Sequence, residues 1–383
     1  GARQQQLNDV YKKVSWRLLP FLLLCYFFAY LDRVNIGFAK LQMQQELGFS
    51  DAVYGMAAGI FFLGYVMFEV PSNLMLEKVG ARKTITRIMI LWGITSMSML
   101  FVNSPTTFYV LRFMLGVFEA GFAPGMIFYL TYWYSGERMA RVMAFVMLAG
   151  PLGGMFGAPV YTHIMTVAPG LPGMSGWQWV FLIEGLPTVI LGIITFFYLT
   201  DHPTQAKWLN DSEKALLANE IQQHQAASTH SGFGAVLKDP WVYFMAFAYF
   251  TIISGIYAIG FWLPSLIKSS GIDDLNTIGW LSAIPYLLSA IFMIVFAKTS
   301  DKMQERKWHS VLAAVAAAAL LIVSVLADSN FTLAFIAIFL LIWLQAKGLR
   351  NEMKEVRIAL TDPEGPIGLS FAKGEARMNN IED

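Results

Sequence analysis

The sequence predicts an all-α integral membrane protein, and three observations support this prediction. Of the 383 residues, 56% are hydrophobic and only 14% are charged, whereas soluble domains carry about a quarter charged residues. The mean hydropathy is +0.53. The hydrophobic residues gather in stretches about 20 residues long, which is the length of a membrane-spanning helix, and no stretch alternates with the period of a barrel strand. We therefore expect a bundle of helices within a lipid bilayer.

Ten apolar stretches are expected to form these helices. The first six lie at 17–38, 55–76, 84–102, 107–133, 141–166 and 177–200. The other four lie at 240–266, 276–298, 309–327 and 331–346. The first stretch is too long, and too charged at its far end, for a cleaved signal peptide, so we interpret it as a retained helix.

Basic residues alternate between the loops and predict the orientation of the chain. They precede the first span and occupy the loops after the second, fourth and eighth spans, whereas residues 103–106 and 167–176 carry no charge. Because basic loops stay in the cytoplasm, the N-terminus and every even-numbered loop are expected there. An even number of spans places the C-terminus on the same side.

One long polar stretch predicts the division into domains. Residues 1–200 are expected to form a bundle of six helices, and residues 201–239 a cytoplasmic linker with a short surface helix. Residues 240–346 would form a second bundle with about four spans, followed by a polar tail at 347–383. The linker has mixed charge, which favours a solvated connector over a partner-binding arm.

Composition and motifs exclude several other functions. The net charge of +1 argues against nucleic-acid binding, and a single cysteine, Cys25, excludes an internal disulfide. The five histidines lack metal-ligand spacing, and no phosphate-binding loop, nucleophile elbow or zinc-protease motif is present. We therefore expect neither an enzyme nor a protein that binds a metal or an organic cofactor.

Two cytoplasmic loops resemble each other. Residues 73–83 read NLMLEKVGARK, and residues 297–307 read AKTSDKMQERK. In both, an acidic residue directly precedes a lysine, and basic residues follow, so that the carboxylate could pair with a basic residue or face a helix N-terminus. An ordinary basic cytoplasmic loop is the alternative for each. Matching positions in two halves favour a gating role, since many transporters are built from duplicated halves. The gating candidates are Glu77, Lys78, Arg82, Asp301, Lys302 and Arg306.

Four further motifs carry a family resemblance. Residues 28–37 read FAYLDRVNIG, 112–125 read RFMLGVFEAGFAPG, 176–185 read GWQWVFLIEG and 201–209 read DHPTQAKWL. With the two loops, they resemble the anion:cation symporter family of the major facilitator superfamily. The loops depart from the superfamily's loop signature, Gly-x-x-x-Asp-Arg/Lys-x-Gly-Arg/Lys-Arg/Lys. Asn73 and Ala297 stand in place of its leading glycine, Glu77 stands in place of its aspartate in the first loop, and Gln304 stands in place of its inner glycine in the second.

The resemblance implies a fold and an activity. Its fold is the major facilitator fold, in which two helical bundles rock about a central site. Its bacterial members import small organic anions, such as hydroxy, sugar or aromatic acids, together with protons. It therefore implies a monomer in the bacterial inner membrane that is driven by the proton gradient and needs no cofactor.

Ionisable residues at membrane depth point to the transport site. Asp32 and Arg33 lie in the outer half of the first span, Arg112 near the outer end of the fourth, and Glu119 near its middle. Such residues are costly in a membrane and mark functional sites by default. We expect Arg33 and Arg112 to bind the anion, because a guanidinium grips a carboxylate with two hydrogen bonds. Asp32 and Glu119 would carry protons, whose binding frees the arginines.

Alternatives remain open for each of these residues. Asp32 and Glu119 could belong to a static ion-pair network, and Arg112 could extend to the membrane surface. Tyr30 and Tyr65 could add hydroxyl groups to the anion site or act as interface or core aromatics. Tyr249, in the seventh span, is a weaker candidate for the same site.

The function has rivals too. The same fold could export or exchange its substrate with protons. The family usually has twelve spans and this chain shows about ten, with a short last span at 331–346. A truncated membrane protein that does not transport is therefore a second alternative.

Overall fold

The computed structural model describes residues 1–146, 148–168, 173–227 and 260–303, together with the single residues 238, 240, 243 and 257. Within these residues the chain forms helices and short connections, with no strand. The described parts of the chain fall into two compact units, of which one comprises Gly1–Ile221 with Gly260–Ile284. The other comprises Gln222–Ile259 with Pro285–Asp383. The division into bundles and linker that we expected from the sequence stays a prediction.

The helices have the following bounds. In the first part of the chain they are α1 (Ala2–Val34), α2 (Ile36–Leu47), α3 (Asp51–Val79), α4 (Ala81–Ser98), α5 (Pro105–Glu119) and α6 (Phe122–Thr131). They continue with α7 (Gly136–Val146), α8 (Ala149–Val167), α9 (Gly176–Tyr198), α10 (Asp211–Ala227) and α13 (Leu275–Met303). Short 3-10 helices occupy Met99–Phe101 and Pro203–Gln205.

Serine residues start three of the long helices. The Ser50 hydroxyl accepts a hydrogen bond from the Val53 amide at 3.2 Å at the start of α3. Ser104 does the same for Thr107 at the start of α5, where Pro105 occupies the first turn. A capping box between Ser175 and Gln178 begins α9. Each of these side chains occupies a backbone group that the helix itself leaves without a partner.

Five helical segments in the described residues are long and apolar enough to cross a membrane. They are Ala2–Leu47, Asp51–Val79, Ala81–Phe101, Pro105–Thr131 and Gly176–Tyr198, and they contain the predicted spans 17–38, 55–76, 84–102 and 177–200 almost completely. The predicted spans at 309–327 and 331–346, and most of 240–266, lie outside the described residues. The predicted span at 276–298 lies within α13.

Two of the predicted spans each comprise two helices. One of them, 107–133, still falls almost completely within Pro105–Thr131, which is long and apolar enough to cross a membrane. The stretch 107–133 divides into α5 and α6 at Ala120 and Gly121, where Gly121 has a φ of 82°. The stretch 141–166 divides into α7 and α8. A left-handed residue cannot continue a helix, and glycine adopts it without a steric penalty. The apolar composition of both stretches hides these breaks.

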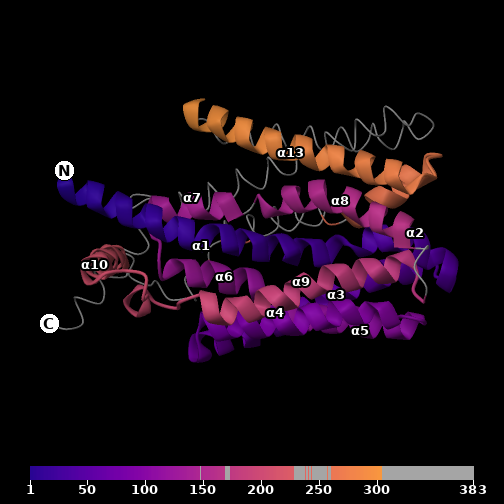
Figure 1. Cartoon of the computed structure of the whole chain (residues 1–383), viewed down its shortest axis with the longest axis horizontal. Helices are drawn as coiled ribbons and strands as arrows, with labels where there is room; N and C mark the ends of the chain where they lie inside the picture. The colour runs from indigo at the N-terminus through magenta and orange to yellow at the C-terminus, as the bar shows by residue number, and fades with distance from the viewer. Residues whose placement is uncertain are drawn as a thin grey trace. The chain divides into compact units, whose positions relative to one another are not determined.

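Two helix pairs pack especially closely, α4 with α9 and α3 with α5 (Figure 1). Glycines make both approaches possible. A Cβ atom on Gly116 of α5 would overlap the Phe61 carbonyl oxygen of α3, and one on Gly185 of α9 would lie 2.9 Å from the Gly93 carbonyl oxygen of α4. Small residues let membrane helices approach to backbone contact. We refer to these as the α3–α5 and α4–α9 interfaces.

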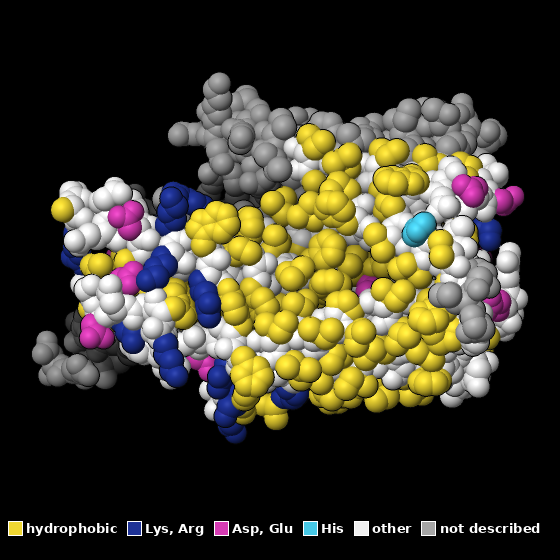
Figure 2. All heavy atoms as spheres, viewed as in Figure 1, with side chains coloured by type: hydrophobic (Ala, Val, Ile, Leu, Met, Phe, Trp, Pro, Cys, Tyr) yellow, Lys and Arg dark blue, Asp and Glu magenta, His cyan; other side chains and the backbone are white. Residues whose placement is uncertain are grey.

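The surface suits a bilayer. Figure 2 shows hydrophobic side chains covering the middle of the visible face, with Lys and Arg gathered toward the end that carries the N-terminus. Exposed apolar residues such as Val66, Val160 and Phe197 are more than half accessible. Such a continuous apolar surface is typical of a lipid-facing protein.

Candidate functional site

Asp32 of α1 lies fully buried against α4 and α9. Its carboxylate accepts hydrogen bonds from the Trp92 indole at 2.5 Å, from the Thr188 hydroxyl at 3.0 Å and from the Ser96 hydroxyl at 3.4 Å. All three donors are neutral. The charge of an ionised Asp32 would therefore be stabilised by dipoles alone within the described residues.

Glu184 of α9 lies beside Asp32. Its carboxylate accepts a hydrogen bond from the Asn35 amide at 2.7 Å and another from the Tyr161 hydroxyl at 2.5 Å. The Thr188 hydroxyl that donates to Asp32 lies on α9 one helical turn after Glu184, so the two acids are neighbours. Asn35 connects α1 to α2 and Tyr161 belongs to α8, so these two acids join five helices, α1, α2, α4, α8 and α9, or the junctions between them.

Arg33, the next residue along α1, points to a different partner. Its Nε donates to the Glu119 carboxylate of α5, and the two side chains form an ion pair. The second Glu119 oxygen is buried and has no hydrogen-bond partner among the described residues. The Arg33 guanidinium also lies 5.3 Å from the centroid of the Tyr65 ring. Tyr65 thus contacts one of the predicted anion-binding residues.

Arg112 of α5 is fully buried, with 0% of its side chain exposed. Its Nε donates to the Ala57 carbonyl oxygen at 3.1 Å, but neither terminal nitrogen has a hydrogen-bond partner in the described residues. The guanidinium lies 4.9 Å from the Phe61 ring centroid, and the Arg33 guanidinium lies 5.8 Å from the same ring. The alternative that Arg112 extends to the membrane surface is therefore wrong.

The four charged residues predicted from the sequence are thus close together but divided between two interfaces. Asp32 lies with Glu184 at the α4–α9 interface, whereas Arg33, Glu119 and Arg112 lie at the α3–α5 interface. The two groups still interact, because the charge of Glu119 acts on Asp32. We expected Asp32 and Glu119 to lie together beside the two arginines, and in the structure Glu119 pairs with Arg33 while Asp32 lies among neutral donors.

The remaining predicted site residues lie in different places. Tyr30 is buried, and its ring faces α8, where Cβ atoms on Gly150 and Gly153 would lie 3.8 Å and 2.8 Å from it. Tyr249 lies outside the described residues. Asp301 and Lys302 lie in α13 with side chains outside the description, and Arg306 lies outside it entirely.

The loop after α3 meets a carboxylate that we did not predict. The Asp201 carboxylate accepts a hydrogen bond from the Arg82 backbone amide at 2.8 Å, at the N-terminus of α4. The Arg82 guanidinium donates to the Phe196 carbonyl oxygen at 3.2 Å. A Cβ on Gly80, whose φ is 97°, would lie 2.8 Å from Asp201, so the glycine lets the carboxylate approach. This contact joins α4 to the end of α9.

Glu77 and Lys78 have no part in that contact. Both are exposed on the last turn of α3. The expectation of a carboxylate facing a helix N-terminus is met by Asp201 instead, 119 residues from its partner. An acid favours that position because the helix dipole and the free backbone amides attract negative charge.

A buried lysine lies toward the end of the molecule opposite the N-terminus. Lys40 of α2 has only 5% of its side chain exposed, and its Nζ donates to the Ser265 hydroxyl at 2.8 Å. It pairs with Asp51 at 3.1 Å and lies 4.5 Å from the centroid of the Trp262 ring. The Tyr54 hydroxyl donates to the Phe261 carbonyl oxygen at 2.8 Å. Residues 261–265 are thereby attached to α2 and α3.

Known proteins resemble this chain over most of its length. The sequence model of the family described as the Major Facilitator Superfamily matches residues 22–347. The chain belongs to the Major Facilitator Superfamily. The resemblance stated from its motifs is thereby confirmed, and this superfamily member is a multi-pass membrane transporter and not an enzyme.

Relatives and solved structures agree with this assignment. A protein of Agrobacterium vitis named as a tartrate transporter is 48% identical over 84% of this chain and 75% of its own length. NicT of Pseudomonas putida, named as a metabolite transport protein, is 45% identical over 85% of this chain and 75% of its own length. The xylose transporter XylE from E. coli has a TM-score of 0.69 at 15% identity, over 89% of this chain and 87% of its own. At that identity the likeness to XylE concerns the fold alone.

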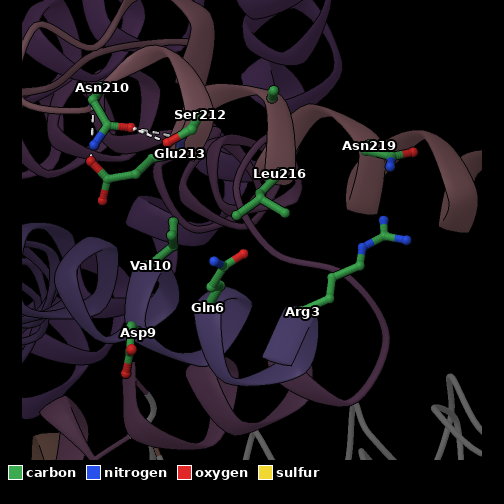
Figure 3. A pocket seen from close by; sticks show the side chains of 10 residues that line it. Arg3, Gln6, Asp9, Val10, Asn210, Ser212, Glu213, Leu216 and Asn219 are labelled. Carbon is green, nitrogen blue, oxygen red and sulfur yellow. Dashed lines mark hydrogen bonds between the residues drawn. The ribbon is translucent and has the colours of Figure 1, made fainter. Parts of the chain in front are cut away.

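A surface pocket is separate from the buried charges. It has a volume of about 550 Å³ and lies between the start of α1 and α10, lined by Arg3, Gln6, Asp9, Val10, Asn210, Ser212, Glu213, Ala215, Leu216 and Asn219 (Figure 3). The figure shows the Arg3 side chain extending toward Asn219 of α10. The pocket is open at the surface, unlike a transport site within a bundle, so we assign it no part in transport by this superfamily member.

Several residues of the buried site were not predicted. Trp92 and Thr188 carry no charge, so no signal in the sequence distinguished them from other core residues. From the sequence we expect Glu184 to make only a structural or gating bond, although it is a lone acid in the apolar span 177–200, which is the same signal that identified Asp32 and Glu119. Among the described residues, no group of three His, Cys, Asp or Glu side chains could hold a metal ion.

Proposed function

We propose that this transporter imports a small organic anion together with protons, by alternating access in the bacterial inner membrane. The observation that carries the proposal is the buried position of the Arg112 guanidinium and its lack of hydrogen-bond partners, among the described residues, at both terminal nitrogens. A fully buried guanidinium whose two terminal nitrogens have no hydrogen-bond partner among the described residues is costly unless a ligand uses them. Two parallel N–H groups match the two oxygens of a carboxylate.

The neighbouring ion pair supports the coupling to protons. Arg33 is held by Glu119, and both arginines lie against Phe61. A proton on Glu119 would remove the charge that holds Arg33, so that both guanidiniums would be available to one anion. Proton and anion would then bind together, and the ion pair would form again only after both have left. The energy comes from the proton gradient, without a cofactor.

The substrate class is supported by the relatives. Two arginines favour an acid with two carboxylates, or with one carboxylate and neighbouring hydroxyl groups, and one relative is named as a tartrate transporter. Tyr65, beside Arg33, would add a hydroxyl group or a ring to the site. We propose a hydroxy acid, sugar acid or aromatic acid as the transported anion.

The orientation and the gates complete the proposal. The basic loops around Arg82 and Arg138 favour the cytoplasm for both termini. The contact between Asp201 and Arg82 would close or brace the cytoplasmic end, and the second loop, with Asp301, Lys302 and Arg306, would do the same for the other half. A monomer suffices for this cycle, because the buried site is built within one chain.

Uptake into proteoliposomes tests the proposal. With the purified full chain, we expect labelled L-tartrate, gluconate or phthalate to accumulate when the outside is more acidic than the inside. Glu119→Gln should abolish the dependence on the gradient, whereas Asp9→Asn, an exposed carboxylate of the same protein on α1, should leave it unchanged. Exchange of internal for external acid without net proton movement would instead favour an exchanger. No movement of any of these acids would refute the proposal.

A further inference from the structure

Asp32 and Glu184 are an unusual pair for a membrane interior. Both side chains are buried, with 0% and 5% exposure. Thr188, one helical turn after Glu184 on α9, donates to Asp32 at 3.0 Å, and Asn35, three residues after Asp32, donates to Glu184 at 2.7 Å. The two acids are therefore neighbours where α1 packs against α9.

No basic side chain neutralises this pair within the described part of the chain. The ion pairs there are those of Lys13 with Glu213, Arg33 with Glu119 and Lys40 with Asp51, and neither acid takes part in one. Two adjacent negative charges in a medium of low dielectric constant repel each other strongly. Holding one proton removes half of the charge and joins the two groups.

The neighbouring donors fit a pair with one remaining charge. The Trp92, Thr188 and Ser96 side chains donate to Asp32, and those of Asn35 and Tyr161 donate to Glu184. These donors occupy oxygens on both residues, so either residue can carry the charge. The arrangement is symmetrical enough for the proton to belong to the pair and not to one residue.

The titratable groups that act on the pair come from three helices. Glu119 of α5 acts on Asp32, Tyr161 of α8 contacts Glu184, and Tyr30 of α1 acts on Tyr161. Arg33, also of α1, pairs with Glu119. On the other packed elements, α4 presents the indole of Trp92 and the hydroxyl of Ser96, and the connection to α2 presents the amide of Asn35.

We propose that Asp32 and Glu184 form a dyad that holds a single proton between them, and that Glu184 is the second proton-binding residue of the transport cycle. This inference rests on the proposed proton coupling for its role, but the existence of the dyad does not depend on it. Because Glu119 acts on Asp32, an ionised Glu119 favours the proton on the dyad. When Arg33 leaves Glu119 for the anion, the field on the dyad changes, and the dyad can bind or release a proton in response.

The dyad also contacts α8 and the junction between α1 and α2, the segments that would move during transport. Glu184 accepts hydrogen bonds from Asn35, between α1 and α2, and from Tyr161 of α8. A second proton would turn one acceptor oxygen into a donor and weaken one of these hydrogen bonds. The protonation state is therefore linked to the packing of α8 and of the α1–α2 junction.

Infrared spectroscopy of the purified full chain tests the dyad without any substrate. A protonated carboxyl group gives a carbonyl band separate from ionised carboxylates, and the band shifts in heavy water. We expect wild-type protein at neutral pH to show such a band, and Glu184→Gln and Asp32→Asn each to remove it. Glu119→Gln and Tyr161→Phe are matched controls, since the first removes a neighbouring acid and the second removes only one donor. Both should retain a band, shifted in Tyr161→Phe.

The outcomes separate this inference from the proposed function. Absence of the band in wild-type protein, or its persistence unchanged in both Glu184→Gln and Asp32→Asn, would refute the dyad. If Glu184→Gln fails to fold, the wild-type spectrum and Asp32→Asn still decide. With L-tartrate in proteoliposomes, Glu184→Gln should shift the pH profile of uptake, which a purely structural role would not do. A dyad band without any acid transport would contradict the proposed function alone.

Discussion

The α3–α5 and α4–α9 interfaces are built alike but carry opposite chemistry. Both rely on glycine to bring two helices into backbone contact. The first holds two arginines and one acid, and the second holds two acids with neutral donors. The residues that separate them are consecutive, because Asp32 and Arg33 project from α1 about 100° apart. One step along a helix therefore divides the proposed proton-binding dyad from the arginines proposed to bind the anion.

Replacing each of the two arginines at the α3–α5 interface by methionine should give the largest difference in stability between two variants. Arg33→Met should destabilise the protein by about 3 kcal/mol, because Glu119 would remain buried without its partner. Arg112→Met should leave the stability unchanged or raise it by ~1 kcal/mol, because it removes two buried nitrogens that have no hydrogen-bond partner in the part of the chain that the structure describes. Both variants should lose anion binding.

Thermal unfolding in detergent measures this contrast conveniently. The chain has a single cysteine, Cys25, which is buried, so a thiol-reactive dye reports unfolding directly. Equal destabilisation by both substitutions would show that the contacts of Arg112 with Ala57 and Phe61 stabilise the fold as much as the ion pair of Arg33 does. In that case Arg112 would lose its place as the anion-binding residue.

Adding one methyl group at each interface ranks their tolerance. Gly116→Ala places a Cβ against the Phe61 carbonyl oxygen, and we expect a loss of about 2–3 kcal/mol from overpacking. Gly185→Ala should lose less, ~1–2 kcal/mol, because its nearest neighbour is the flexible Met97 side chain. Gly59→Ala is the matched control within α3, since a Cβ there has nothing within 4 Å.

The same dye assay ranks these variants. Apparent melting temperatures should fall in the order Gly59→Ala, Gly185→Ala, Gly116→Ala. A Gly116→Ala variant as stable as the control would mean that α3 and α5 can separate without penalty. The α3–α5 interface would then be the softer of the two.

The smallest expected change in stability concerns Glu213, a carboxylate at the surface. The amide of Asn210 and the ammonium of Lys13 lower the pKa of Glu213, which also closes a capping box at the start of α10. Because the pKa is lower in the folded state, the stabilisation is present above the unfolded pKa and is lost as pH falls through the folded pKa. Glu213→Gln should therefore cost ~0.5 kcal/mol at neutral pH and almost nothing in acid.

The control for Glu213 lies in the same turn. Asp211→Asn removes an exposed acid that is not part of the capping box, so its stability curve should run parallel to that of wild-type protein. Melting temperatures measured from acid to neutral pH make the comparison. A Glu213→Gln difference that grows as pH falls would contradict the assigned sign.

Burial and charge explain what the sequence could predict. The long helices follow from apolar composition, and Asp32, Arg33, Arg112 and Glu119 follow from the cost of charge within a membrane. All four are indeed close together at depth in the bundle. Their pairing was not predictable, because the contacts of Asp32 join it to residues 60 to 156 positions away.

The breaks and the Asp201 contact escaped prediction for related reasons. Gly121 lies in a continuous apolar run, where glycine is compatible with a helix as well as with a turn. Asp201 lies in a motif that we attributed to the linker, and only the fold brings it to α4. Local patterns predict elements, while partners distant in sequence depend on how the helices pack.

Lys40 offers a natural chemical probe of motion. Its amine is covered by Trp262 and Ser265, so an amine-reactive reagent reaches it only while residues 261–265 separate from α2. The exposed lysines of this chain, such as Lys78, react in every state. The acylation rate of Lys40 relative to these residues, read by peptide mass spectrometry, therefore counts openings at that end of the molecule in unmodified protein.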